Sequence, residues 1–196
     1  MLLGKQAPDF KTEAYQQGKV KEIKLSDFRG KWVTMFFYPG CFTFVCPTEL
    51  AMLAETYDEF TKIDAEVLSV SCDSVYSSKA WHEEELSKMV EGGIPFPMLA
   101  DQGGEIGKLY DVYDAAVGQN VRGRFVIDPE GVIKAVEVLP PEVGRNIEEI
   151  LRQLQAFQYV RDTGDVTPAN WFPGKQALAP KIELAGKVWS TWNAPK

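Results

Sequence analysis

The order in which strand-like and helix-like segments follow one another constrains the fold of this chain more than any other feature. Residues 32–38 (WVTMFFY) form a nearly continuous apolar run, which is typical of a strand that is covered on both faces. After a short loop, Pro47 stands where a first helical turn tolerates proline, and apolar residues recur at helical spacing from Leu50 to Phe60. This pattern predicts a strand, a loop and a helix.

The same alternation continues beyond the first helix. Residues 66–71 (EVLSVS) predict a second short strand. Asp73 or Ser74 then offers the N-cap of a helix that extends to about Val90. The segment GGIPFP follows and interrupts the pattern, because proline and glycine end regular elements.

The second half of the chain predicts a hairpin and a final helix. Residues 121–127 and 131–139 look like two strands joined by the turn DPEG, so they should pair antiparallel. The last clear helix follows Gly144 and carries one apolar stripe, formed by Ile147, Ile150, Leu151, Leu154 and Phe157. Together these elements predict an α/β fold with a mixed central sheet and helices on both faces, the outline of a thioredoxin-like core.

Two segments lie outside this predicted core. Residues 1–31 precede it as an N-terminal extension, and we expect residues 1–159 to form one thioredoxin-like domain. Residues 160–196 hold three of the five tryptophans and are too few to build a core of their own. Because buried aromatic side chains need a partner surface, we expect this C-terminal arm to pack at an interface with another subunit.

Charge and hydropathy argue against two classes of partner. The chain has 21 Lys and Arg against 28 Asp and Glu, a net charge of −7, so phosphate backbones and anionic lipids should repel it. Its longest strongly apolar stretch, at residues 32–38, is far shorter than the ~18 residues of a membrane helix. Three cysteines are too few for a secreted disulfide framework, and the first residues lack the apolar segment of a signal peptide. We expect a cytoplasmic location with no nucleic-acid or membrane partner.

Cys46 carries the strongest chemical signal in the sequence. It stands directly before Pro47, in the first turn or cap of a predicted helix. Backbone N–H groups and the positive end of the helix dipole favour a thiolate at this position. Because the thiolate is the nucleophilic form of cysteine, we expect Cys46 to be reactive rather than a small buried apolar residue.

Other cysteine chemistries do not fit the spacing. Cys41 and Cys46 are separated by four residues, whereas a thioredoxin-type redox pair has two between its cysteines. A zinc site needs close pairs of cysteine or histidine, and the single histidine, His82, stands beside three glutamates on a predicted helix, where we expect it to be exposed. Nothing in the sequence places His82 as the base of a cysteine protease. The pattern predicts no metal and no cofactor.

A thiolate at Cys46 suits attack on the O–O bond of a peroxide, provided that hydrogen-bond donors stabilise the leaving oxygen. Thr43 could bond the sulfur, the peroxide or only its own loop, and Pro39 would shield the sulfur from water. Parallel strands end at the same edge of a sheet, where an antiparallel strand begins. Arg122, at the start of the predicted hairpin, should therefore lie beside Cys46, with Arg124 deeper along the same strand.

The segment around Cys46, FFYPGCFTFVCPTEL, closely resembles the active-site segment of peroxiredoxins of the alkyl hydroperoxide reductase type. Further segments resemble that family in the same order: APDF, SVSCDSVYSSKAWHEE, PFPMLAD, RGRFVIDPEG, VGRNIEEILRQLQAFQ and VTPANWFPGK. The resemblance covers nearly the whole chain. It implies a thioredoxin-like fold and a thiol-dependent peroxidase that reduces hydrogen peroxide and alkyl hydroperoxides.

The resemblance also implies roles for single residues. Cys46 would be the peroxidatic cysteine, which a peroxide oxidises to a sulfenic acid. Its pocket would consist of Pro39, Thr43 and Arg122, and Glu49 would help to position the arginine. The resemblance further implies a homodimer that often assembles into a decamer, and a thiol or a disulfide reductase as electron donor. A ring-forming holdase chaperone or a peroxide sensor is the alternative function.

Two positions depart from the family pattern. Typical members carry aspartate where this chain has Cys41, and a resolving cysteine where this chain has Thr167. The usual disulfide between subunits is therefore excluded, and two routes remain open for the sulfenic acid. In one, Cys41 is the resolving thiol and is reached when the first helical turn unwinds. In the other, an external thiol attacks Cys46 directly. Cys72 is a third candidate for the resolving thiol and ranks last, because a cysteine that ends a strand is more often a packing residue.

Overall fold

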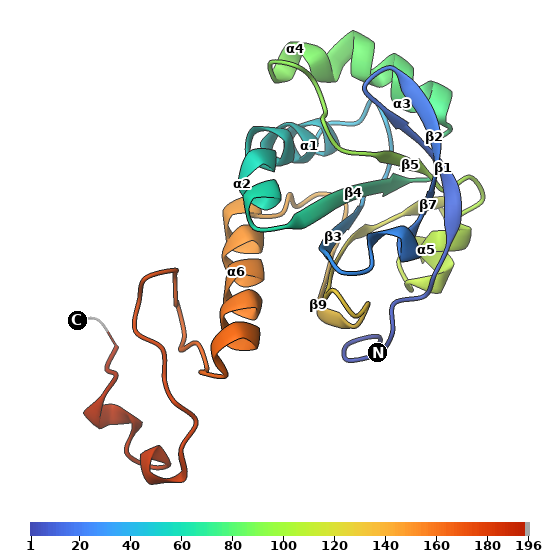
Figure 1. The fold of residues 1–196 in the computed structure, drawn as a ribbon. Helices are drawn as coiled ribbons and strands as arrows, with labels where there is room; N and C mark the ends of the chain where they lie inside the picture. Colours follow the sequence, from blue (N-terminus) through green and yellow to red (C-terminus); the bar gives the residue numbers. More distant parts are fainter. Residues whose placement is uncertain (195–196) are drawn as a thin grey trace. The chain divides into compact units, whose positions relative to one another are not determined.

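The computed structural model describes residues 1–194, which divide into two compact units, Met1–Ile147 and the residues from Glu148 onward. The main strands of the first unit are β1 (Lys11–Gln16), β2 (Lys19–Lys24), β3 (Trp32–Phe37), β4 (Ala65–Ser71), β5 (Met98–Ala100), β8 (Arg122–Ile127) and β9 (Ile133–Leu139). They form one seven-stranded sheet in the order β2-β1-β5-β4-β3-β8-β9 (Figure 1).

Strand directions in this sheet are mixed, as the sequence predicts. β3, β4 and β5 run parallel, β8 runs antiparallel to β3, and β8 and β9 form the predicted antiparallel hairpin. All six residues of β3 are buried, because the strand is covered on both faces. Its alternate residues Val33, Met35 and Phe37 belong to a core that also includes Leu68, Val70, Leu99, Ile106, Tyr110, Phe125 and Ile127.

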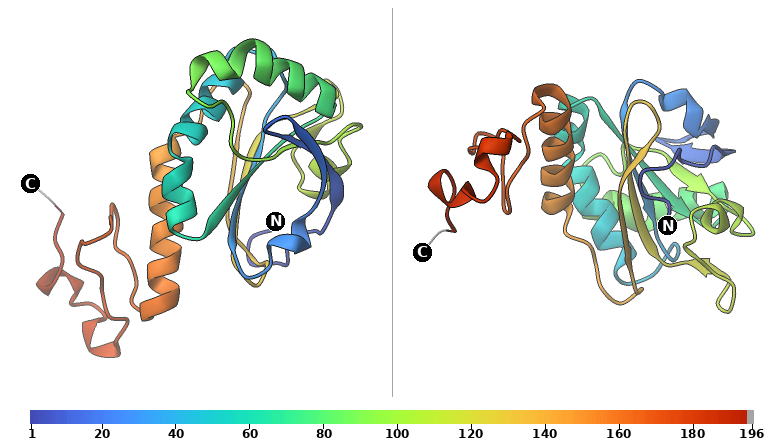
Figure 2. Two further views of the ribbon diagram at one scale, coloured as in Figure 1. Left: turned by 45° about the horizontal axis from the view of Figure 1, so that its top comes forward. Right: turned by 90° about the horizontal axis from the view of Figure 1, so that it is seen from below.

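Helices cover the two faces of the sheet. They are α1 (Cys46–Glu55), α2 (Tyr57–Lys62), α3 (Val75–Trp81), α4 (Ser87–Met89) and α5 (Glu105–Leu109), with a 3-10 turn at Leu25–Phe28 and a small hairpin of β6 (Tyr113–Asp114) and β7 (Gln119–Asn120). Figures 1 and 2 show α1, α2 and α3 gathered along one side and α5 on the other. The predicted α/β fold with a mixed central sheet is confirmed.

The predicted helices are broken where local bonding changes. The helix expected up to Phe60 divides at Thr56, whose hydroxyl donates to the Met52 carbonyl at 2.8 Å while its backbone leaves the helical region. The helix expected up to Val90 changes to a π-helical turn at His82–Leu86 before α4. Ser74, rather than Asp73, is the N-cap of α3 and accepts a hydrogen bond from the Ser77 N–H.

The N-terminal extension is part of the sheet. Residues 1–31 supply β1 and β2, and β1 pairs antiparallel with β5, so the extension closes one edge of the core. No local pattern predicts β5, which is only three residues long and follows the proline-rich segment at residues 92–97. Short central strands of this kind are specified by their neighbours rather than by their own periodicity.

The second unit consists of α6 (Ile147–Thr163), whose first residue still belongs to the first unit, and the C-terminal arm. The division between the units falls at the start of α6. In the arm, Val166 and Leu178 form an isolated bridge, and two 3-10 turns follow at Ile182–Leu184 and Val188–Ser190. Within residues 1–194, none of the helices has the length and apolar character needed to cross a membrane.

Candidate active site

Three segments of the first unit meet at one edge of the sheet. β3 ends at Phe37 and leads through buried Pro39 into the loop before α1, and the parallel strand β4 ends at Ser71. β8 runs in the opposite direction and begins at this edge with Arg122. Arg122 therefore lies at the edge of the sheet where β3 ends, which is the position that the sequence predicts for it.

Cys46 is the first residue of α1, and its side chain is completely buried. Pro47 follows in the first turn, where its missing N–H costs no helical hydrogen bond. Arg122 Nη1 donates a hydrogen bond to Cys46 Sγ at 3.5 Å. The thiol of Cys46 and a guanidinium thus share a closed environment in which charge interactions are stronger than in water.

Glu49 lies one helical turn after Cys46, and its carboxylate accepts hydrogen bonds from two arginines. Its Oε2 accepts from Arg122 Nη1 at 2.7 Å and from Arg145 Nη2 at 2.8 Å. Its Oε1 accepts from the backbone N–H and the Nε of Arg145, each at 2.8 Å. All three side chains are buried, so the carboxylate bridges two guanidiniums that are shielded from solvent.

The electrostatics of this cluster favour an ionised Glu49. Burial alone would raise the pKa of the Glu49 carboxyl, but the hydrogen bonds and charge of Arg145 and the charge of Arg122 lower the pKa below its ordinary value. The second arginine has further anchors, since Arg145 Nη1 donates to the Gly123 carbonyl at 2.7 Å and its guanidinium lies 4.5 Å from the centre of the Phe36 ring.

Arg122 is fixed from a second side as well. Its Nε donates to the Pro141 carbonyl at 2.8 Å, and its Nη2 donates to the same oxygen. One nitrogen, Nη1, therefore remains for Glu49 and the sulfur of Cys46. A planar guanidinium held by fixed acceptors keeps its direction without losing further freedom when a ligand arrives.

Thr43 and Cys41 lie in the loop between β3 and α1. The Thr43 hydroxyl donates to the Gly40 carbonyl at 3.0 Å, so in this structure it bonds its own loop, one of the three partners that the sequence leaves open. Cys41 is half-buried, and its backbone N–H donates to Asp73 Oδ2 at 2.8 Å. Burial and then the charge of Asp73 raise the pKa of the Cys41 thiol well above its ordinary value.

Comparison with known proteins identifies the family. The model of the AhpC/TSA family matches residues 3–136, and that of the C-terminal domain of 1-Cys peroxiredoxin matches residues 156–189. The chain belongs to the AhpC/TSA family. It is an oxidoreductase of the peroxiredoxin type with thiol-dependent peroxidase activity, and family membership does not favour the alternative holdase function.

Individual peroxiredoxins match over most of their length. A selenocysteine-containing peroxiredoxin of Peptoclostridium acidaminophilum is 54% identical over 97% of this chain and 95% of its own. The reduced 2-Cys peroxiredoxin of Plasmodium vivax is 37% identical, with a TM-score of 0.88 over 93% of this chain and 95% of that chain. The yeast mitochondrial 1-Cys peroxiredoxin, solved to explain its thiol resolving mechanism, is 29% identical with a TM-score of 0.82, covering 90% and 85%.

Sequence reasoning misses one arginine of this peroxiredoxin and misplaces its histidine. Arg145 lies in the segment VGRNIEEIL, which resembles the family, but it has no periodic signal because it stands in a loop. The expectation that His82 is exposed is wrong: its ring is half-buried, and Nε2 accepts a hydrogen bond from the Ile94 N–H at 3.1 Å. The π-helical turn that begins at His82 turns the ring toward this loop rather than toward the solvent with Glu83.

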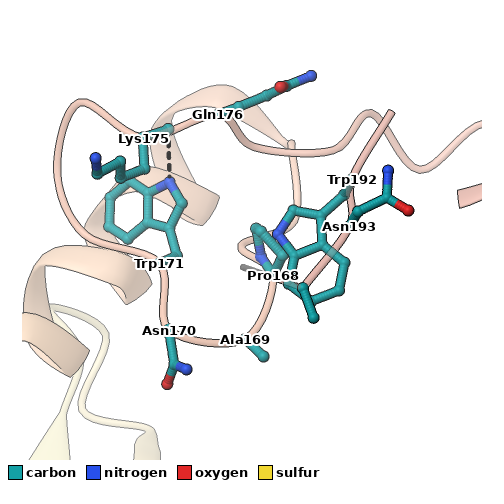
Figure 3. A pocket seen from close by; sticks show the side chains of 9 residues that line it. Pro168, Ala169, Asn170, Trp171, Lys175, Gln176, Trp192 and Asn193 are labelled. Atoms are coloured by element: carbon teal, nitrogen blue, oxygen red, sulfur yellow. Dashed lines mark hydrogen bonds between the residues drawn. The ribbon is translucent and has the colours of Figure 1, made fainter. Parts of the chain in front are cut away.

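Cys72 lies outside this cluster. Cys72 is half-buried, and burial with the nearby Asp101 carboxylate raises the pKa of its thiol to about 11. In the arm of the peroxiredoxin, Figure 3 shows Trp171 and Trp192 on opposite sides of a pocket of about 380 Å³. The Trp171 indole N–H donates to the Lys175 carbonyl at 2.9 Å, and the lining contains no cysteine, histidine or carboxylate. Within residues 1–194, no group of three side chains is arranged to hold a metal ion.

Proposed function

We propose that Cys46 is the peroxidatic cysteine of this peroxidase and that a peroxide oxidises it to a sulfenic acid. The observation that carries the proposal is the hydrogen bond from Arg122 Nη1 to Cys46 Sγ at 3.5 Å, with Glu49 binding the same nitrogen. A fixed guanidinium beside the sulfur can bind the thiolate that attacks the peroxide. The same guanidinium can then stabilise charge on the peroxide as the O–O bond lengthens.

In the proposed reaction the Cys46 thiolate attacks one peroxide oxygen and the O–O bond breaks. An S–O bond forms, the sulfur is oxidised to the sulfenic acid, and the other oxygen leaves with a proton as water or an alcohol. Thr43 gives its hydroxyl hydrogen to Gly40, so its oxygen presents lone pairs that can accept a hydrogen bond from the peroxide. Pro39 is buried beside this loop and keeps water away.

A trapping experiment tests which sulfur reacts first. Reduced protein is mixed with one equivalent of hydrogen peroxide in the presence of dimedone, which labels sulfenic acids, and the adducts are mapped by mass spectrometry. We expect label on Cys46 and none on Cys72, because burial and Asp101 disfavour the Cys72 thiolate. Label that appears first on Cys41 or Cys72 would contradict the proposal.

The substrates and the electron donor follow from this chemistry. We propose that hydrogen peroxide and alkyl hydroperoxides are reduced and that a thiol or a disulfide reductase returns the oxidised protein to its reduced form. Such a cycle needs a supply of thiols, which the cytoplasm provides. The chain would carry its three cysteines there in the reduced state.

We also propose that the protein is a homodimer that assembles further into a decamer. β9 is the last strand of the sheet, and the exposed fractions of Val136 and Val138 on it are 39% and 50%. An open edge with apolar side chains is suited to pairing with the same strand of a second copy. Residues 1–159 would be the catalytic domain, and the arm at residues 160–196, where Trp189 is 70% exposed, would pack at an interface between subunits.

Replacing Val138 by lysine tests this edge. A charge on an edge strand opposes pairing with another strand, so we expect the V138K protein to have a lower molar mass than the wild type in size-exclusion chromatography with light scattering. Val117→Lys is the matched control, because Val117 is exposed but lies outside β9. An unchanged mass of V138K, or an equal loss with V117K, would exclude β9 as the interface.

A further inference from the structure

Cys41 lies in a polar cluster that the proposed peroxide chemistry does not use. The cluster comprises Tyr38 at the end of β3, Asp73 after β4, and Ser78 on α3, and all three interact with the Cys41 side chain. Asp73 is its best-fixed member, since Oδ2 accepts from the Cys41 N–H at 2.8 Å and from the Ser71 hydroxyl at 2.9 Å. The Asp73 carboxylate is therefore fixed beside Cys41 and faces its thiol.

Burial and Asp73 together favour the protonated form of the Cys41 thiol in the reduced protein. Burial raises the pKa of that thiol, and the charge of Asp73 and its hydrogen bond to the side chain raise the pKa further. A thiol that donates to a carboxylate is not a nucleophile at rest. It becomes one only when the carboxylate accepts its proton as an S–S bond forms, which is general base catalysis.

Two buried hydroxyls lie beside the Cys41 thiol and interact with it. They belong to Tyr38 and Ser78, which are 0% and 1% exposed. Hydrogen bonds from these hydroxyls act to lower the pKa of the Cys41 thiol against the larger effects of burial and Asp73, so they stabilise negative charge on the sulfur as its proton leaves. Burial raises the pKa of Tyr38 well above its ordinary value, which keeps it a donor, and its hydroxyl lies within electrostatic range of both Cys41 and Cys46.

The loop between the two cysteines is built to rearrange. Phe42 has a left-handed backbone with φ of +54°, which is strained for a bulky residue, and Phe44 is 94% exposed. Val45, the N-cap of α1, offers no side-chain hydrogen bond to the first turn. Once the start of α1 unwinds, an offset of five residues allows the Cα separation of roughly 5.5 Å that a disulfide needs.

We propose that Cys41 resolves the Cys46 sulfenic acid and that Asp73 is the base that accepts the Cys41 proton. The Cys41 sulfur attacks the Cys46 sulfur, an S–S bond forms and the S–O bond breaks. The proton passes from Cys41 to Asp73 and then to the leaving hydroxide, which departs as water. The sulfur of Cys41 is oxidised, that of Cys46 is reduced, and an external thiol reduces the disulfide in a later step. This inference rests on Cys46 being the peroxidatic cysteine.

The substitution Asp73→Asn tests the base directly. Asparagine keeps an oxygen for the Cys41 N–H, so the loop should stay in place while the base is lost. Protein treated with one equivalent of peroxide and no added thiol is quenched at intervals, and the Cys41–Cys46 disulfide is quantified by mass spectrometry. We expect D73N to form sulfenic acid on Cys46 at the wild-type rate and the disulfide at least tenfold more slowly.

The pH profile separates a base from a residue that only positions the loop. The titratable groups that face Asp73 are Cys41, Tyr38 and Cys72. With Asp73 as base, the wild-type disulfide rate should be nearly independent of pH between 6 and 8, whereas in D73N it should rise about tenfold per pH unit because hydroxide must remove the proton. If the D73N protein does not fold, the wild-type pH profile alone tests the role of Asp73. A wild-type disulfide rate that rises tenfold per pH unit would exclude Asp73 as the base.

The outcomes distinguish this inference from the proposed function. If Cys46 forms a sulfenic acid that persists without a Cys41–Cys46 disulfide until external thiol is added, Cys41 and Asp73 have no resolving role and the one-cysteine route holds. If no sulfenic acid forms on Cys46, the proposed function itself fails. Cys72→Ser is the matched control and should change neither rate, because Cys72 takes no part in either step.

Discussion

The Cys46→Ser protein is expected to reduce peroxide at least about 10³-fold more slowly than the wild type, at the background rate of the thiol reductant. Serine is close to cysteine in size, so the buried pair of Arg122 and Glu49 should keep its arrangement. Its hydroxyl stays protonated at neutral pH and does not take oxygen from a peroxide to give a sulfenic acid. The rate is measured by stopped-flow consumption of hydrogen peroxide with excess dithiothreitol as electron donor.

Cys72→Ser is the matched control for this experiment. Cys72 is half-buried like Cys41, but it lies near Asp101 rather than the Arg122 cluster, so its replacement should leave the rate within about twofold. Both proteins are compared by circular dichroism to establish that they are folded. Retention of peroxide reduction by Cys46→Ser would show that the Arg122 contact does not mark the reacting sulfur.

The sequence predicts the centre of this site because strand directions place it. Buried runs at β3 and β4 indicate parallel strands, and the turn after residue 127 indicates a hairpin of β8 and β9. Because β8 pairs antiparallel with β3, its first residue, Arg122, stands at the edge where β3 ends. Cys46 is predicted on the same basis, since Pro47 fixes where α1 begins. These inferences depend on backbone geometry, which short sequence patterns specify well.

Residues that depend on long-range packing escape such reasoning. Arg145 completes the Glu49 cluster from a loop 96 positions farther along the chain, and only the folded sheet brings the two together. The contact between Asp73 and Cys41 also depends on long-range packing, because it joins the end of β4 to the loop after β3. The three-residue strand β5 and the orientation of His82 are likewise set by neighbours rather than by local periodicity.

The second large effect is expected from Glu49→Gln, which should lower the free energy of unfolding by about 3–5 kcal/mol. Glutamine preserves the shape of the side chain but removes the charge that joins Arg122 to Arg145, so two buried guanidiniums lose their common counter-ion. Urea unfolding followed by circular dichroism measures the change. Arg122 would also lose the acceptor that shares its Nη1 with Cys46, so oxidation of the sulfur should slow in parallel.

The difference between wild type and Glu49→Gln should depend on pH in one direction. The pKa of Glu49 is lowered in the folded protein, so its contribution to stability is fully present above the unfolded pKa of about 4.3. It is lost as the pH falls through the folded pKa, because the carboxyl then becomes neutral like the amide. The two unfolding curves should therefore stand far apart at pH 7 and approach each other below about pH 4.

Glu55→Gln separates the effect of the buried charge from that of any acidic residue on α1. Glu55 lies on the same helix but is exposed to solvent, so its replacement should change the free energy of unfolding by no more than about 0.5 kcal/mol at either pH. Equal losses for the two variants would mean that the charge of the helix as a whole, and not the bond to two arginines, stabilises the fold. A loss confined to Glu49→Gln, and shrinking in acid, requires an ionised carboxylate between the guanidiniums, which is the arrangement that also holds Arg122 against the sulfur.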